Sequence, residues 1–407
     1  MSTRVNKVLA EAGGLFRGPH RVFPLIGKIT RDKWRTAVDR RHMYSYVKTE
    51  RSTARTLPSV IKWIINAQRT DGGIAAYYSL LTGYSASYPE VTGYLIPTLY
   101  DFAHSAGDHS ALCAAEHATR WLLSLQLDSG GFPAGLQGSG GAPSVFNTGQ
   151  ILQGLVRATT ETGDGDIYKA ALAAGDWLVS MQGTDGAWSG PEAYQGKAHT
   201  YYTMVAWAIA QLAEISGDEK YSLAAERNMD WALAHLRPNG WPEGLNLEGH
   251  PNYLHFVAYA IQGILESAIL RRRPDAVQAI SKPAWLLLRK FETSKRLPGA
   301  FDSDFSAGHN FTCLTGNAQM SCVWLRFFAV NRDLRYLNAA LKMNELLKNL
   351  VPARGARGIG GGVGGSYPIW GAYQPMRYIS WGCKFFADAL MLEQRLMRDL
   401  EVPACAS

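Results

Sequence analysis

The 407-residue sequence predicts an all-α fold, an (α/α)6 barrel of six helical hairpins with a basic extension at its N-terminus. Three observations support this prediction. A motif containing tryptophan and glycine recurs at intervals of about 55 residues. Amphipathic helical patterns alternate with patterns that are apolar on every side. The excess of positive charge is confined to the first 51 residues, and the rest of the chain has the composition of an ordinary globular domain.

The recurring motif ends a helix and is followed by a glycine turn. Such a turn predicts a helix stop, because Gly adopts the left-handed conformation at little cost. We expect the Gln of the motif to be structural, as a donor to carbonyl groups that the helix end leaves without partners. The three complete copies contain Trp63 and Gln68, Trp121 and Gln126, and Trp177 and Gln182, and a fourth keeps Trp231 with Asn239, Gly240 and Trp241 but lacks the Gln.

Six amphipathic helices are expected to alternate with six buried ones. A helix that is apolar on all sides is buried on all sides, so the second set forms an inner ring and the first set surrounds it. This ring makes residues 52–407 one domain, with the barrel itself ending near residue 397. The outer helices are predicted to begin near Thr56, Ser110, Ile167, Lys220, Asp275 and Leu334, with Asp108, Asp218 and Asp333 placed as caps. The inner helices are predicted to begin near residues 88, 147, 199, 250, 315 and 377.

The N-terminal arm, residues 1–51, carries the charge. It holds 12 basic and 4 acidic side chains, whereas the other 356 residues hold 29 and 30. No nucleic-acid partner is expected, because the barrel lacks the charge that neutralises phosphates. Residues 22–26 (VFPLI) are apolar and lie between Arg21 and Lys28. The arm therefore either contacts an anionic membrane or a protein partner, or packs across the barrel with its charges in solvent.

Cysteine usage and hydropathy restrict the class of protein further. The five cysteines are scattered without a CxxC spacing, which argues against a disulfide framework and a structural zinc site. No metal or cofactor is predicted. No apolar run reaches the length of a transmembrane helix, and the N-terminus lacks the apolar core of a secretory signal. A cytoplasmic location is therefore expected.

The candidate site lies at the rim, which we define as the end of the barrel where the six inner helices begin. Polar and aromatic side chains gather in the first turns of these helices, and the helix dipoles there favour anionic groups. Aromatic faces stack on sugar rings, while amides and imidazoles bind hydroxyl groups, so this inventory predicts a carbohydrate substrate. The predicted binding residues are Tyr88, Asn147, Gln150, His250, Asn252, Tyr253, His255, Asn317, Gln319, Arg377, Tyr378, Trp381 and Lys384.

Two acid–base mechanisms remain open from the sequence. His199, with Tyr201 or Tyr202, could abstract the C5 proton of a uronate while an amide from Asn147 or Asn252 stabilises the enolate. This set is similar to the Asn/His/Arg/Tyr constellation of barrel-type alginate lyases.

A pair of carboxylates is the other possibility. Glu90 with Asp302 or Asp304 could act as glycosidase acid and base. Some of the candidate residues could also have purely structural roles. Glu90 follows Pro89 at a helix start and could belong to the cap, Asp302 and Asp304 could solvate a loop, and Lys384 could be a paired interior cation.

The motif resembles the QW repeat of terpenoid cyclases and protein prenyltransferases, which are α/α toroids. The six-hairpin pattern is similar to the (α/α)6 barrels of glycoside hydrolases, polysaccharide lyases and sugar epimerases. The terpenoid resemblance is incomplete, because the Asp-x-Asp-Asp motif is reduced to Asp302-Ser303-Asp304-Phe305 and no Asp-Asp-x-x-Asp motif occurs. The resemblance implies a lyase, epimerase or hydrolase acting on an oligo- or polysaccharide. The alternatives are a terpenoid-cyclase-like enzyme and a non-catalytic glycan-binding or scaffold toroid.

Overall fold

A computed structural model describes residues 52–245, 247–307, 309–353, 355 and 358–401. The arm of residues 1–51 lies outside the described residues, and so do the two interpretations of it. The described chain is predominantly helical, as predicted. Its outer helices are α3 (Thr53–Ala67), α5 (His109–Leu123), α7 (Gly165–Ser180), α9 (Glu219–Ala234), α11 (Pro274–Ser294) and α13 (Leu334–Leu350). Its inner helices are α4 (Pro89–Ala106), α6 (Val145–Thr162), α8 (Thr203–Ser216), α10 (Leu254–Leu270), α12 (Leu314–Asn331) and α14 (Ser380–Glu401).

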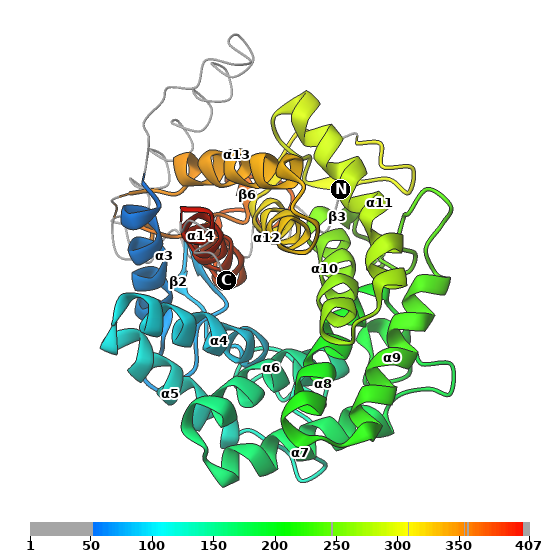
Figure 1. Ribbon diagram of the computed structural model, residues 1–407. Coiled ribbons are helices and arrows are strands. Elements are labelled where there is room, and N and C mark those ends of the chain that lie inside the picture. The colour runs from blue at the N-terminus through cyan, green and yellow to red at the C-terminus, as the bar shows by residue number, and fades with distance from the viewer. Residues whose placement is uncertain (1–51, 246, 308, 354, 356–357, 402–407) are drawn as a thin grey trace.

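The hairpins close into a ring. Each inner helix packs on the next inner helix along the chain, and α14 packs on α4 to complete the circle. In Figure 1 the outer helices surround this ring, and the blue α3 lies beside the red α14 where the two ends of the barrel meet. The predicted (α/α)6 barrel is confirmed.

Aspartate caps begin four of the outer helices. The carboxylates of Asp108, Asp218 and Asp333 accept backbone N–H groups at 2.9, 3.0 and 2.9 Å, as expected. Asp164 caps α7 in the same way at 2.8 Å, although this cap was not predicted from the sequence. Each of these caps satisfies a backbone donor that would otherwise lack a partner at a helix N-terminus.

The Gln of the repeat joins one outer helix to the next. Gln126 Nε2 donates to Gly130 O at 2.9 Å in its own turn and to Ala170 O of α7 at 2.9 Å. Gly130 has φ of +91°, and a Cβ there would lie 2.3 Å from Ala173 O of α7. Gln68 and Gln182 make the same pair of bonds, to Gly72 and Ala114 and to Gly186 and Ala224. The structural role predicted for the Gln is therefore confirmed, and the glycine permits close contact between neighbouring outer helices.

Short strands connect the loops at the rim. Strand β1 (Tyr77–Ser79) lies between β2 (Gly83–Tyr84) and β7 (Arg377–Ile379), so the first and last loops of the ring are paired. Two further antiparallel pairs join β3 (Asn252–Tyr253) to β4 (Ala300–Phe301) and β5 (Thr312–Cys313) to β6 (Ser366–Tyr367). Segments of two or three residues are too short to show a β periodicity, which explains why the sequence did not predict them.

Ion pairs connect the inner helices toward the end opposite the rim. Arg157 of α6 pairs with Asp101 of α4 at 2.7 Å. Arg326 of α12 binds both carboxylate oxygens of Glu266 on α10, with contacts of 2.7 to 3.0 Å. These pairs lie in the later turns of their helices and stabilise that end of the ring with planar, directional contacts. None of the helices in the described part of the chain combines the length and hydropathy that a membrane span requires.

Candidate active site

Aromatic side chains meet across the barrel axis near the rim. Phe146 of α6 contacts Tyr259 of α10 with ring centroids 5.5 Å apart, although these helices are not neighbours in the ring. Tyr259 also contacts Phe385 of α14 at 5.6 Å. Contacts between non-adjacent inner helices place these rings at the barrel centre. We call the polar and aromatic side chains gathered there the central cluster: Tyr88, Glu90, Tyr94, Phe146, Asn147, Tyr201, Tyr202, His255, Tyr259, Tyr373 and Phe385.

Glu90 is the carboxyl group of the central cluster. It is the second residue of α4, and Tyr88 Oη donates to its Oε2 at 2.5 Å. Burial raises the pKa of Glu90 from 4.5 to about 7, and the hydrogen bond from Tyr88 partly offsets that rise. Part of the side chain is still accessible to solvent. Glu90 is therefore partly protonated near neutral pH.

Six tyrosines surround this carboxyl group. Burial is the largest cause of the raised pKa in each of them, and the charge of Glu90 raises each pKa further; they are Tyr88, Tyr94, Tyr201, Tyr202, Tyr259 and Tyr373. The phenols consequently stay protonated and serve as hydrogen-bond donors and stacking surfaces.

His255 on α10 is a buried, neutral imidazole in the same cluster. Burial lowers its pKa from 6.5 to about 3, although a hydrogen bond with Gln319 opposes the shift. The Oε1 atom of Gln319 lies 2.6 Å from Nδ1, so Nδ1 carries the hydrogen and Nε2 carries the lone pair. Nε2 has no hydrogen-bond partner among the described residues. It is therefore available as an acceptor.

His199 lies beside the cluster, but both of its ring nitrogens are engaged. Nδ1 is 2.7 Å from Gly244 O, and Nε2 is 3.0 Å from Tyr194 O. The ring is 2% exposed and stacks on Tyr201 at 4.8 Å. Because neither nitrogen offers a lone pair to a substrate, this geometry disfavours the predicted role of His199 as a base.

Asp302 and Asp304 lie in an exposed turn after β4. The Asp304 carboxylate accepts the backbone N–H of Ser306 at 2.7 Å, and hydrogen bonds from Ser306 lower its pKa. No hydrogen bond or ion pair in the described part of the chain joins either carboxylate to Glu90. Both aspartates are therefore exposed loop residues without a direct bond to Glu90, and the carboxylate pair considered from the sequence stays a prediction.

Three other predicted binding residues line the central cluster or lie next to it. Asn147 lies near Tyr88 and lowers the pKa of that phenol, while its buried amide nitrogen has no hydrogen-bond partner among the described residues. Gln150 is fully buried and accepts from Gln153 at 3.0 Å. Trp381 donates to the hydroxyl of Tyr373 at 2.8 Å. The contacts of Gln150 and Trp381 orient groups of the cluster.

Lys384 is a paired interior cation. It lies 5% exposed over the ring of Phe385, with Nζ 4.7 Å from the centroid, and it forms an ion pair with Asp388. Asp388 in turn accepts from Thr98 of α4 at 2.7 Å. This arrangement matches the structural explanation considered from the sequence.

The remaining predicted residues support the rim. Asn317 donates to Cys313 O at 2.8 Å and accepts from Leu297 N at 3.3 Å, which fixes the loop before α12. Arg377 stacks 4.1 Å over the ring of Tyr77. In the same region, Asn252 donates to Phe301 O and Tyr253 donates to Ala372 O. Tyr378 is buried in β7, and His250 is exposed in the loop before β3.

Three tyrosines of the central cluster were not predicted from the sequence. Tyr94 and Tyr259 lie four residues after Glu90 and His255 on the same helices, so helical spacing could have identified them. Tyr373 lies in the loop between β6 and β7, and no periodicity points to it. No group of three or more His, Cys, Asp or Glu side chains within the described ranges is arranged to hold a metal ion.

Known structures share the fold at low sequence identity. No family model and no curated protein sequence matches this chain. The chain is similar to an unsaturated glucuronyl hydrolase from Bacillus sp. GL1, with 15% identity, coverage of 86% of this chain and 97% of that chain, and a TM-score of 0.65. A cellobiose 2-epimerase from Spirochaeta thermophila matches with 17% identity, 86% and 96% coverage, and a TM-score of 0.67. An alpha-amylase from Clostridium perfringens matches with 12% identity, 84% and 99% coverage, and a TM-score of 0.62. These similarities establish the (α/α)6 barrel as the fold.

Proposed function

We propose that this protein is a carbohydrate-active hydrolase in which Glu90 is the general acid. The observation that carries the proposal is the carboxyl group of Glu90, buried among six tyrosines with its pKa raised to about 7. An acid whose pKa lies near the working pH is both protonated and able to donate. Glu90 would protonate the oxygen of the bond to be cleaved, and water would add to the sugar carbon, so that one C–O bond breaks and one forms. The added water loses a proton to solvent, and the Glu90 carboxylate takes one up again from solvent.

The surroundings of Glu90 suit a sugar. Pyranose rings have apolar faces that stack on tyrosine and phenylalanine, and their hydroxyl groups pair with phenols and amides such as Asn147. A polyisoprenoid would leave these polar groups without partners at a free-energy cost, so the terpenoid-cyclase alternative has less support. The neighbouring structures include hydrolases and epimerases of saccharides, which guides the choice of test substrates.

A uronate-containing substrate remains part of the proposal. The inner helices begin at the rim, so the positive ends of their dipoles point toward it and favour a carboxylate. One of the similar structures is described as an unsaturated glucuronyl hydrolase specific for heparin. Both neutral and uronate-containing oligosaccharides therefore belong in the screen.

Proton abstraction, by an epimerase or a lyase, is the second candidate. The observation that favours it is His255, which is neutral and has a free Nε2 lone pair in the same cluster as the protonated Glu90. A carboxyl group with a raised pKa beside a histidine with a lowered pKa is typical of an acid and base pair. The low pKa of His255 makes it a weak base, and for this reason hydrolysis ranks first.

Product analysis tests the proposal and separates the two candidates. Wild-type protein would be incubated with neutral oligosaccharides and with saturated and unsaturated uronyl oligosaccharides in deuterated water. New reducing ends indicate hydrolysis, deuterium on carbon with altered stereochemistry indicates epimerisation, and new absorbance near 235 nm indicates a lyase. Glu90→Gln should reduce turnover by about 10²- to 10⁴-fold. Asp304→Asn is the matched control and should leave turnover unchanged.

Two outcomes contradict the proposal. Full activity in Glu90→Gln would exclude Glu90 as the acid, and glycan binding without turnover would support the non-catalytic alternative. Loss of activity in Asp304→Asn would instead add this carboxylate to the mechanism, as the pair considered from the sequence requires. The cytoplasmic location and a membrane or protein contact of the arm stay predictions.

A further inference from the structure

His199 joins two rim segments through a contact that requires a proton. The ring lies between the segment that contains η3 (Tyr194–Gly196) and the segment at Gly244. It reaches a backbone carbonyl on each side, Gly244 O at 2.7 Å from Nδ1 and Tyr194 O at 3.0 Å from Nε2. With 2% of the residue exposed, solvent cannot replace either partner.

Only the imidazolium form satisfies both contacts. A neutral imidazole has one N–H donor and one lone pair, whereas the cation has two donors. In a neutral ring, one lone pair would therefore face a carbonyl oxygen at hydrogen-bond distance, and the two would repel each other. A protonated ring donates to both carbonyls through charge-assisted bonds, and its positive charge stacks favourably on Tyr201 at 4.8 Å.

The ionisable groups around the ring belong to several elements. The phenols of Tyr194, Tyr201 and Tyr202 contact it at ring-centroid distances of 6.4, 4.8 and 5.4 Å. On α4, Glu90 acts electrostatically on both Tyr201 and Tyr202.

The segments on either side of the ring carry further charges. In the Gly244 segment, the Glu243 carboxylate pairs with Arg237 at 2.6 Å and so is already neutralised. In the η3 segment, Lys197 is exposed and Glu192 is half-buried.

We propose that His199 is a proton-dependent latch that holds the η3 segment against the rim and positions Tyr201 and Tyr202 beside Glu90. The latch borders the site of the proposed function but does not depend on Glu90 being the acid. His199 is thus a positioning residue, which explains why a histidine next to two cluster tyrosines presents neither nitrogen to the cluster.

Deprotonation should release the contact to Tyr194 first. The shorter bond to Gly244 O keeps the remaining hydrogen on Nδ1, so the Nε2 lone pair then faces Tyr194 O. Tyr194 is 49% exposed and can move outward. Its backbone N–H donates to Tyr202 Oη at 2.7 Å, and Gln195 Oε1 accepts from Glu248 N at 3.0 Å, so these bonds are the next to loosen.

The first test observes the ring directly in the full-length wild-type protein. Nitrogen-15 NMR of labelled histidine, from pH 5.5 to 9, reports whether each ring nitrogen of His199 carries a hydrogen. The expected result is two protonated nitrogens at low pH and loss of the Nε2 hydrogen as pH rises. A ring that stays in one protonation state throughout this range contradicts the latch.

The second test measures loosening of the segment. Chymotrypsin cleavage after Tyr194 would be followed by mass spectrometry in wild type, His199→Gln and His235→Gln. His235 is the matched control, because its ring contacts a single carbonyl, Trp231 O at 2.7 Å, which a neutral imidazole satisfies. In His199→Gln both N–H donors belong to one nitrogen, so the side chain cannot donate to the two carbonyls on opposite sides. This variant should be cleaved about tenfold faster than wild type at pH 6, with the difference vanishing at high pH.

Dividing the cleavage rate of the variant by that of wild type at each pH removes the pH dependence of the protease itself. A ratio that does not change with pH contradicts the proposal, and so does a similar change in His235→Gln. If His199→Gln fails to fold, the NMR titration of the wild-type ring decides the question. Neither measurement uses a saccharide, so failure of the latch and failure of the proposed activity are distinguishable.

Discussion

Hydrogen-bond partners distinguish Glu90 from His199, the two strongest single-residue candidates. Sequence proximity to Tyr201 and Tyr202 made His199 the favoured base, but two backbone carbonyls occupy its nitrogens. Glu90 has one hydrogen-bond donor, Tyr88, and is otherwise enclosed by aromatic side chains. A carboxyl group with a single donor in such surroundings retains its proton, because the charged form is poorly solvated.

The raised pKa of Glu90 predicts a pH-dependent penalty on stability. In the unfolded chain Glu90 ionises near pH 4.5, whereas in the folded protein it keeps its proton until about pH 7. Stability is therefore lost as pH rises through this window, by at most about 3 kcal/mol, and is constant above it. Glu90→Gln should be more stable than wild type at pH 8 and equally stable at pH 4, as measured by urea unfolding. Equal stability at both pH values would contradict the raised pKa.

The phenol of Tyr88 predicts the direction in which the Glu90 titration moves. Its hydrogen bond stabilises the carboxylate and lowers the pKa of Glu90. Tyr88→Phe should therefore shift the titration of the Glu90 carboxyl carbon, followed by NMR, to higher pH. In the control Tyr336→Phe, on the outer helix α13, the titration should not move. A shift of the Tyr88→Phe titration to lower pH would show that the hydrogen bond favours the acid form instead.

Among the elements, the outer helices are joined by the repeated glutamine and not by side-chain packing alone. Each Gln amide donates once to its own turn and once to the following helix. The glycine beside it leaves room for the backbone of that helix. The fourth repeat has Leu236 at the Gln position, and an isolated β-bridge from Leu236 to Pro242 closes its turn.

Removal of the hydrogen bonds of one such Gln should measurably lower the free energy of unfolding. Gln126→Met keeps the length of the side chain but leaves Gly130 O and Ala170 O without their donor. We expect the free energy of unfolding to fall by about 1–2 kcal/mol. Gln137→Met, at an exposed loop position, should change it by less than about 0.5 kcal/mol. If the two substitutions change the free energy of unfolding equally, the hydrogen bonds of Gln126 contribute no stability.

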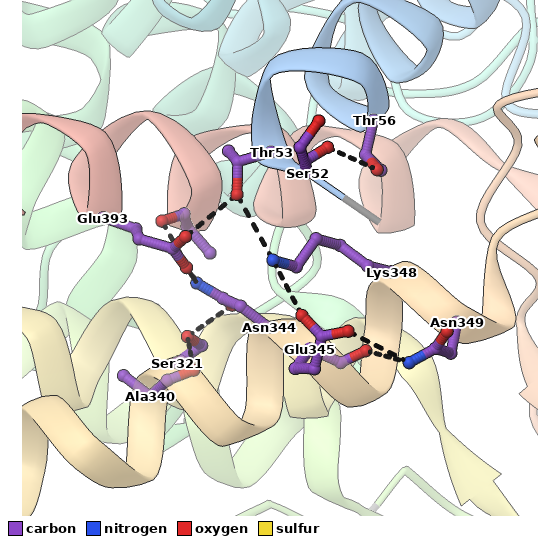
Figure 2. Close-up of polar contacts among 11 residues, drawn as sticks. Ser52, Thr53, Thr56, Ser321, Ala340, Asn344, Glu345, Lys348, Asn349 and Glu393 are labelled. Atoms are coloured by element: carbon purple, nitrogen blue, oxygen red, sulfur yellow. Dashed lines mark hydrogen bonds and ion pairs between the residues drawn. The ribbon is translucent and has the colours of Figure 1, made fainter. Parts of the chain in front are cut away.

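At the scale of the whole molecule, the ring must close between elements far apart in the sequence. Figure 2 shows the polar contacts at this closure. Thr53 at the start of α3 donates to Glu393 of α14 at 2.9 Å, and Asn344 of α13 donates to the same carboxylate at 2.7 Å. Asn344 accepts from Ser321 of α12 at 2.6 Å. Glu393 therefore connects the first hairpin to the last.

Loss of this carboxylate should weaken the closure specifically. Glu393→Ala leaves the buried Asn344 amide and Thr53 hydroxyl without their acceptor, and we expect a loss of about 2–4 kcal/mol of unfolding free energy. Hydrogen exchange should accelerate first in α3 and α14. Glu292→Ala removes an exposed pair with Arg289 and should cost less than about 1 kcal/mol. Uniform acceleration around the ring in Glu393→Ala would contradict a local role.

Much of the barrel was predictable because its determinants are local. Periodicity, aspartate caps and glycine stops act within a few residues, and the predicted starts at Ser110, Lys220 and Asp275 lie one residue from the observed ones. Glu90 and Tyr88 were also selected from the sequence. Tyr373 could not be, because only the return of its loop to the barrel centre brings it near Glu90.

The sequence by itself determined the number of hairpins, the alternation of inner and outer helices and the set of polar residues at the rim, because helical propensity and hydrophobic periodicity are properties of short segments. Only the tertiary structure decided which of those residues can exchange a proton. A pKa depends on solvent access and on partners from other helices, and these raise the pKa of Glu90, lower that of His255 and fasten His199 between two carbonyls. The exposed turn of Asp302 and Asp304 was decided in the same way, because burial belongs to the packed ring and not to the residue.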